Sequence, residues 1–215
     1  MNLASQEFVR YSTRVELIQQ LNKEKPNGIG VEVGVFKGEF SKIIMENWNG
    51  TLYMVDVWSS LSKDEYIDAS DHGNFSENEI YGAAINNIKG YDDRAIMVRA
   101  KSEAASHMFE DNSLDFVYID ANHAYDYVAQ DINLWYPKVK PGGYISGHDY
   151  LSYIDYNDPN ENFKGNGKDV DIYGHDGKYW GVFGVNPAVD EFCIANGYQP
   201  YVTKEYSGTW YLNKK

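Results

Sequence analysis

Apolar residues recur at helix-like and strand-like spacings that alternate along the chain. Residues 13–22 carry apolar positions at helical spacing, and the Lys-Pro-Asn-Gly break at residues 25–28 ends this predicted helix. Residues 30–34 form a short apolar run typical of a buried strand, and a helical pattern follows it as far as residues 49–50. Residues 51–57 are the next strand. Together they predict a unit of two parallel strands joined by a right-handed helical crossover.

The alternation continues to the end of the chain. Further strands and helices are predicted for short apolar runs: strands at residues 95–99, 114–119 and 144–146, and helices at residues 103–109, 128–136 and 187–196. The Lys-Pro-Gly-Gly sequence at residues 140–143 is predicted to form a turn, and Gly197 to end the last helix. Two final strands near residues 199–203 and 209–213 predict a hairpin. The expected fold is α/β, with a seven-stranded, mostly parallel sheet and a C-terminal antiparallel hairpin.

Two polar segments interrupt this order. Residues 58–93 have little apolar pattern apart from a predicted helix near residues 79–88, so they are interpreted as an insertion at the ligand side of the sheet. Residues 151–180 are rich in Asn, Asp, Gly and Tyr, and we expect a long, lid-like surface loop there. Neither an internal repeat nor a second domain is evident, so residues 1–215 are interpreted as a single domain.

Composition narrows the classes of partner. The chain has 19 Lys and Arg residues against 32 Asp and Glu residues, a formal net charge of −13. Such a surface would repel nucleic-acid backbones and anionic membranes, so neither is expected as a partner, and a small molecule fits better. The single cysteine, Cys193, is expected to be a small buried apolar residue. No secretory signal or membrane span is evident, and the default expectation is a cytoplasmic location.

A glycine motif lies at the first strand-to-helix junction. Residues 31–41 contain E-x-G-x-x-x-G, formed by Glu32, Gly34 and Gly38. Gly34 would let the backbone pass close to a ligand, and Gly38 would permit close packing between strand and helix. Asp56 follows 22 positions after Gly34, at the end of the next strand, where a carboxylate can bind both hydroxyls of a ribose. The pattern favours a nucleoside ligand, and a structural turn is the alternative.

This ordered combination resembles the class I S-adenosylmethionine-dependent methyltransferases, which have a Rossmann-like fold. The resemblance covers residues 28–213 and includes the final hairpin. It implies a set of cofactor-binding residues: Glu32, Gly34, Gly38, Asp56, Val57, Trp58, Ser102 and Asp120. Glu32 and Gly34 would lie near the methionine end, Asp56 near the ribose, and Lys101 with Ser102 at the adenine edge. Ser102 has an alternative interpretation as the N-cap of the following helix.

A second group of polar residues follows the fourth and fifth strands. Asp120 and His123 come directly after one strand, and His148 and Asp149 after its predicted neighbour. Because parallel neighbouring strands bring their carboxyl ends together, the two acids are expected to converge. Two close carboxylates repel each other unless a proton or a cation lies between them, and oxygen-rich sites favour Mg²⁺ or a similar hard ion. The sequence therefore predicts a divalent-metal site.

The D-x-x-H-x-Y and G-G-x-x-x-G-H-D-Y stretches resemble the macrocin-type sugar O-methyltransferases and, more distantly, the catechol O-methyltransferases. The resemblance implies that Asp120 and Asp149 are metal ligands and that His123 is the general base. Several relatives have two adjacent acids where this chain has His148 before Asp149, so the third ligand is open between His148 and Asn122. The alternative for His123 is that it only orders the loop.

The expected reaction is direct displacement, in which an acceptor oxygen attacks the sulfonium methyl while the metal acidifies the hydroxyl and His123 takes its proton. The expected acceptor is a small polar, sugar-like molecule, and a homo-oligomer is compatible with these observations. Alternatives are a metal-independent N- or O-methyltransferase, or a Rossmann-like nucleotide-binding protein without catalysis. An NAD-dependent oxidoreductase would require G-x-G-x-x-G, and residues 34–39 do not provide it.

Overall fold

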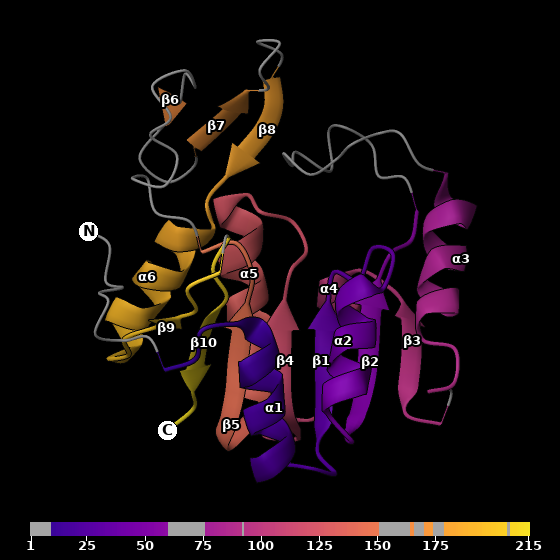
Figure 1. The fold of residues 1–215 in the computed structure, drawn as a ribbon. Coiled ribbons are helices and arrows are strands. Elements are labelled where there is room, and N and C mark those ends of the chain that lie inside the picture. The colour runs from indigo at the N-terminus through magenta and orange to yellow at the C-terminus, as the bar shows by residue number, and fades with distance from the viewer. Residues whose placement is uncertain are drawn as a thin grey trace.

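A seven-stranded sheet runs through the middle of the molecule (Figure 1). The computed structural model describes residues 10–59, 76–91, 93–150, 164–165, 170–173, 179–205 and 207–215. Its strands are β1 (Ile29–Val33), β2 (Thr51–Asp56), β3 (Ala95–Arg99), β4 (Leu114–Ile119), β5 (Val139–Gly147), β9 (Tyr201–Val202) and β10 (Trp210–Asn213). They lie in the order β3-β2-β1-β4-β5-β10-β9, and among these seven strands only β10 runs in the opposite direction. The predicted fold class is confirmed.

Helices cover both faces of this sheet (Figure 1). They are α1 (Arg14–Glu24), α2 (Glu39–Asn47), α3 (Glu77–Asn87), α4 (Ser102–Ser106), α5 (Tyr125–Trp135), the 3-10 helix η2 (Tyr136–Lys138) and α6 (Val185–Asn196). The first three pack on one face, where Leu17 and Ile44 are fully buried. On the other face α4, α5 and α6 bury residues such as Trp135 and Cys193. The two faces thus form two apolar cores, and Cys193 is buried as predicted.

Local sequence signals explain where several helices begin and end. The Thr13 side chain accepts a hydrogen bond from the Glu16 amide and caps α1. Ser76 and Glu79 form a reciprocal capping box at the start of α3. Gly197 ends α6 with a φ of 67°, a left-handed conformation that favours glycine. The helix predicted inside the insertion and the predicted stop at Gly197 are therefore confirmed, whereas residues 60–75 and 92 of the insertion lie outside the described residues.

The prediction of an irregular loop over residues 151–180 is wrong for the parts that the structure describes. These parts contribute to a separate sheet, which consists of β6 (Lys164–Gly165), β7 (Val170–Tyr173) and β8 (Tyr179–Phe183). The three strands lie in this order, and neighbours pair antiparallel. The loop was predicted from a shortage of aliphatic residues, but strands in a small sheet pair through their backbones and need few of them. The remaining residues of the predicted lid lie outside the described residues.

The predicted turn at residues 140–143 is also wrong, because these residues belong to β5. The pairing of β4 with β5 shifts register between Leu114 and Phe116, which marks a local irregularity. Gly142 has a φ of 75°, and its amide donates to the Lys214 carbonyl at 2.7 Å. Gly and Pro are tolerated at such an irregularity, so the turn-like composition reflects a distorted strand.

The strand order places a topological switch point between β1 and β4, the neighbours from which the chain builds the sheet in opposite directions. In open α/β sheets, ligands bind in the crevice beyond the carboxyl ends of the strands at this point. Figure 1 shows the small sheet β6-β7-β8 beyond the same edge of the central sheet. Within the described parts of the chain, every helix is too short or too polar to cross a bilayer.

Candidate functional site at the switch point

The glycine turn, residues 34–38, links β1 to α2 at the switch point. Gly34 has a φ of 87°, and a Cβ atom there would lie 2.0 Å from the Asp120 carbonyl oxygen. Only glycine allows this approach, so Gly34 brings the ends of β1 and β4 together. Gly38 begins α2 in the left-handed conformation and packs against Ala84 of α3. Its predicted role in strand-to-helix packing is therefore corrected to helix-to-helix packing.

The Asp56 carboxylate is bound by backbone amides. Its Oδ2 atom accepts from the amides of Val35 and Phe36, both at 2.9 Å, and Oδ1 accepts from Trp58 at 2.8 Å. The glycine turn itself thus supplies hydrogen-bond partners for the acid that was predicted to bind ribose. A contact with ribose stays a prediction. In such a contact the ribose hydroxyls would share the Asp56 carboxylate with the backbone amides or replace their hydrogen bonds.

Val57 and Trp58 form the segment that leaves β2 beside the glycine turn. Trp58 is only 2% exposed and has a φ of 40°, and its indole Nε1 donates to the Phe36 carbonyl at 2.9 Å. The Arg99 guanidinium donates to the carbonyls of Val57 at 3.1 Å and Trp58 at 2.7 Å. These bonds fix the segment against the turn, and its predicted contact with the adenine stays a prediction.

Glu32 lies inside the protein beneath the glycine turn. It is 1% exposed, and its Oε2 atom accepts a short hydrogen bond from the Ser41 hydroxyl in α2. Burial raises the pKa of Glu32 to about 8, although the bond from Ser41 lowers it. Burial therefore favours the protonated form of this carboxyl. The structure gives Glu32 a supporting place under the turn, and its predicted contact with the methionine end stays a prediction.

Ser102 is the first residue of α4, and the N-cap is Lys101, whose side chain makes no capping bond. The alternative that Ser102 is the cap is therefore wrong. Its hydroxyl donates to Asp131 Oδ1 at 2.5 Å and accepts from Trp135 Nε1 at 2.8 Å. Burial raises the pKa of Asp131 to about 6, and the bond from Ser102 opposes this rise. Contacts of Lys101 and Ser102 with adenine stay predictions.

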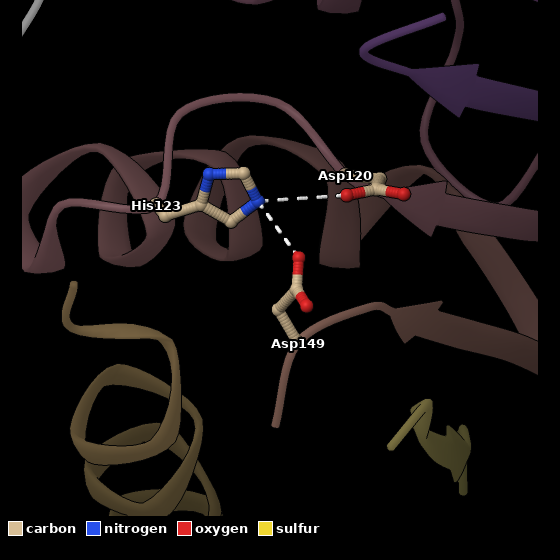
Figure 2. A group of neighbouring side chains, drawn as sticks. All are labelled: Asp120, His123 and Asp149. Carbon is tan, nitrogen blue, oxygen red and sulfur yellow. Dashed lines mark ion pairs between the residues drawn. The ribbon is translucent and has the colours of Figure 1, made fainter. Parts of the chain in front are cut away.

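An acid–histidine cluster, formed by Asp120, His123, His148 and Asp149, lies at the ends of β4 and β5. His123 Nε2 is 3.0 Å from Asp149 Oδ2 and 3.6 Å from Asp120 Oδ1, as Figure 2 shows. His148 Nδ1 is 3.3 Å from Asp149 Oδ2 and 3.9 Å from Asp120 Oδ2. The structure thus brings together the residues that the sequence predicted at these two strand ends, with the imidazoles between the carboxylates.

Contacts within this cluster shift the pKa values of its members. Burial alone would raise the pKa of Asp149, but the contacts from His123 and His148 outweigh it, and the pKa is lowered. Burial would lower the pKa of His148, and the neighbouring Asp149 and Asp120 raise it instead. The cluster therefore favours an ionised Asp149 beside the two imidazoles.

Asp149 has a left-handed backbone, with a φ of 57°, a conformation that few non-glycine residues adopt and that asparagine and aspartate adopt more readily than most. Long-range contacts hold it there. The Asp149 amide donates to the Ser207 carbonyl at 3.3 Å, and the Tyr150 amide donates to Gly208 at 2.9 Å. The buried Tyr150 hydroxyl donates to Asp190 Oδ1 of α6 at 2.5 Å. Such strain persists only where the surroundings impose it, and it is common at functional sites.

The loop that carries His123 is also attached to α6. The His123 ring stacks on Phe183, with centroids 5.1 Å apart and planes 9° apart, and the Gly184 amide donates to the His123 carbonyl at 2.7 Å. Two residues further on, the Tyr125 hydroxyl donates a short hydrogen bond to Glu191 Oε2. Neighbouring acids of α6 therefore hold both loops of the acid–histidine cluster through tyrosine hydroxyls.

The sequence interpretation missed several of these residues. Phe183, Asp190 and Glu191 carry no motif, although Asp190 sits among the apolar positions of its helix, and a buried acid there requires a donor. Arg14, whose guanidinium lies 4.4 Å from the Phe40 ring centroid near the glycine turn, was also missed. No periodicity or spacing connects Arg14 to the crevice, because only the packing of α1 brings it there.

The donors of the cluster fit a divalent cation. Asp120, His123 and Asp149 each offer an atom, and these atoms lie within 4.8 Å of one another. Carboxylate oxygens suit Mg²⁺, whereas an imidazole nitrogen among the ligands favours Mn²⁺ or Zn²⁺. The predicted third ligand, His148, also faces both acids. Asn122, the other candidate, accepts a hydrogen bond from the Ala124 amide through Oδ1.

Comparison with known families gives a match over this region. The sequence profile of a methyltransferase domain matches residues 31–150, which is more than half of the chain. The matched part begins in β1 and ends after β5, so it includes the glycine turn, Asp56 and the acid–histidine cluster. An uncharacterised protein of Acanthamoeba polyphaga mimivirus is 30% identical over 135 residues, which are 60% of this chain. The match covers 55% of that protein, so the chain spans little more than half the length of this relative.

Solved structures share the fold at low sequence identity. The O-methyltransferase NovP is 15% identical, with a TM-score of 0.55 over 94% of this chain and 79% of NovP. A Staphylococcus aureus protein assigned as a caffeoyl-CoA O-methyltransferase is 12% identical, with a TM-score of 0.62 over 94% of this chain and 83% of that protein. At these identities the likeness extends to the fold alone.

Proposed function

The chain belongs to the methyltransferase domain family, and from this premise we propose that it transfers a methyl group from S-adenosylmethionine to a hydroxyl of a small, sugar-like acceptor. The observation that carries the proposal is the position of the acid–histidine cluster. Asp120, the first member of the cluster, lies against Gly34 of the glycine turn. A cofactor over the turn would therefore present its sulfonium beside groups that can bind and deprotonate a hydroxyl.

In this proposal the acceptor oxygen forms a bond to the methyl carbon as the carbon–sulfur bond breaks. S-adenosylmethionine supplies the electrophilic methyl and leaves as the neutral thioether. His123 Nε2 receives the hydroxyl proton, and the nearby carboxylates of Asp149 and Asp120 stabilise the resulting imidazolium. The stacked Phe183 ring and the bond from Gly184 keep the imidazole oriented. Most of the rate enhancement would come from positioning the two reactants.

We further propose divalent-metal assistance. Asp120, Asp149 and His148 would hold the ion, which leaves His123 for proton transfer. A bound divalent cation supplies a Lewis acid that lowers the pKa of the acceptor hydroxyl. The acidic character of the whole chain, with a formal net charge of −13, supports a small-molecule acceptor over nucleic acid or an anionic membrane. A cytoplasmic location and a homo-oligomer remain parts of the proposal.

The proposal is tested by methyl transfer from labelled S-adenosylmethionine to a panel of polyhydroxylated acceptors, before and after exhaustive chelation. We expect activity to fall after chelation and to return with Mg²⁺ or Mn²⁺. The His123→Ala variant should lose about 100-fold or more in rate, whereas His107→Ala, which removes an exposed histidine at the end of α4, should not. Undiminished activity after chelation would reject the metal and favour a metal-independent methyltransferase. Binding of the cofactor without transfer to any acceptor would favour a non-catalytic nucleotide-binding protein.

A further inference from the structure

Arg14 places a guanidinium group close to the cofactor crevice. It is the first residue of α1 and is half-buried. Its guanidinium lies over the Phe40 ring, 4.4 Å from the centroid, and Phe40 follows the glycine turn in the first turn of α2. The Phe40 ring in turn packs on Tyr118 of β4, with centroids 4.4 Å apart. Arg14 is thus stacked beside the turn and close to the end of β4, two residues before Asp120.

The donors of Arg14 are incompletely used. The Tyr118 hydroxyl lies near its guanidinium and raises its pKa. Among the described residues, no carboxylate oxygen lies within 4.0 Å of it, although Asp120 and Glu205 are near enough to raise its pKa against the effect of burial. Arg99, across the crevice, is paired with Glu77 at 3.5 Å and with two carbonyls. A guanidinium has five N–H donors, so Arg14 retains donors for an anion.

A positive group here would balance the acids of the crevice. The other ionisable groups near the turn and the strand ends include Asp56, Asp120 and Asp149, the imidazoles of His123 and His148, and Lys37 of the glycine turn. The methionine part of the methyl donor ends in a carboxylate and an ammonium group. The acids suit the ammonium, but they would repel the carboxylate unless a positive side chain compensates.

We propose that Arg14 binds the carboxylate of the methionine part of S-adenosylmethionine. The inference rests on the proposed function, because it requires the sulfonium nucleoside to lie over the glycine turn. A planar guanidinium can bind a carboxylate through two parallel N–H bonds, and stacking on the Phe40 ring holds its plane in place. Arg14 thereby determines recognition of the amino-acid end, while the glycine turn and Asp56 serve the nucleoside end.

Calorimetric titration with two ligands tests this assignment. S-adenosylhomocysteine carries the carboxylate, and its decarboxylated analogue keeps the adenosine, the sulfur and the amine. We expect Arg14→Gln to weaken S-adenosylhomocysteine binding by about 10- to 100-fold and to change binding of the analogue by less than about threefold. Arg14→Lys keeps the charge but cannot form two parallel N–H bonds to a carboxylate. Its affinity for S-adenosylhomocysteine should lie between those of Arg14→Gln and wild type. Lys42→Gln removes an exposed charge from α2 as a control and should change neither affinity.

The same titrations separate failure of this inference from failure of the proposed function. Equal weakening of both ligands by Arg14→Gln would show that the variant disturbs the whole crevice and would overturn the inference. Unchanged affinity for both ligands would overturn it too, because the carboxylate then binds elsewhere. If wild type bound neither ligand, the proposed function itself would be rejected, and the inference with it.

Discussion

The two ends of the crevice hold their carboxylates by different means. At the end of β2, Asp56 accepts hydrogen bonds from backbone amides, and the glycine turn that supplies two of them lies 20 and 21 positions away in sequence. At the end of β5, Asp149 is in contact with two imidazole rings, and its strained backbone is held by the C-terminal hairpin and by Tyr150 bonded to Asp190. The first site is made by one compact strand–helix–strand unit, and the second by segments from the whole C-terminal half.

This difference teaches what each end tolerates. Backbone amides do not depend on side-chain identity, so the end at Asp56 needs little more than a turn of the right shape. The acid–histidine cluster requires specific side chains on β4, β5 and α6 together. We therefore expect substitutions in the cluster to lower the rate of the chemical step. Substitutions in the glycine turn should lower the stability of the fold and the affinity for the methyl donor.

The largest effect is expected from Asp149→Asn. Asparagine tolerates the left-handed backbone, so the substitution removes the charge beside His123 without forcing the chain to move. We expect kcat to fall about 1000-fold, through loss of a metal ligand and of imidazolium stabilisation, and donor affinity to change less than about threefold. Steady-state kinetics and calorimetry measure the two effects. Asp126→Asn, in the exposed first turn of α5, is the matched control. A parallel loss of donor affinity would break the proposed division between the two ends.

Gly34→Ala should produce the next largest effect, and on stability. The new Cβ atom would lie 2.0 Å from the Asp120 carbonyl oxygen, and alanine would be strained at a φ of 87°. We expect the free energy of unfolding to fall by about 3 kcal/mol. Urea denaturation measures it. Gly82→Ala in α3, where a Cβ meets nothing within 4 Å, is the control and should stabilise slightly. Equal behaviour of the two variants would contradict the close approach of β1 and β4.

Glu32→Gln tests the protonated acid beneath the turn. Because its pKa is raised to about 8, the folded state keeps a proton that the unfolded chain loses near its ordinary pKa of 4.5. The folded state therefore binds more protons between these values, and its stability falls as pH rises through this window and levels above pH 8. The variant should lose this slope, which over the whole window amounts to about 5 kcal/mol. Unfolding free energies at several pH values give the measurement, and an identical slope in the variant would reject a protonated Glu32.

The smallest effect is expected from Tyr150→Phe, which removes the bond from Tyr150 to Asp190 and leaves the aromatic ring. We expect kcat to fall about tenfold, since the variant loses a hydroxyl that helps to hold Asp149 in place but keeps the proposed metal ligands. Tyr127→Phe, at an exposed position of α5, should leave kcat unchanged. An unchanged kcat in Tyr150→Phe, with a lower unfolding midpoint alone, would show that α6 supports only folding.

Much of the fold could be predicted because local patterns carry it. The strands β3 and β4 have the predicted bounds, and the hairpin of β9 and β10 lies where turn residues predicted it. The sheet β6-β7-β8 and the distorted start of β5 were missed, because Gly, Pro and polar residues occur in loops and in irregular strands alike. Composition alone does not distinguish these two states.

The candidate site divides in the same way. Position after neighbouring parallel strands predicted that Asp120 and Asp149 would converge, and the structure places His123 and His148 between them. Position in the sequence did not predict which groups form hydrogen bonds with the polar residues of the site. The amides around Asp56, the bond between Ser102 and Asp131, and the supports from α6 all depend on contacts that no motif encodes.

The sequence by itself determined the order of strands and helices in the central sheet, the glycine turn and the identities of the acids and histidines at the strand ends, since these follow from periodicity and from the rules of parallel sheets. Only the tertiary structure decided that α6 holds both loops of the acid–histidine cluster and that Arg14 lies beside the glycine turn from α1. The physical reason is that helix packing sets such contacts. The position of a side chain across an interface depends on every residue that fills the core beneath it.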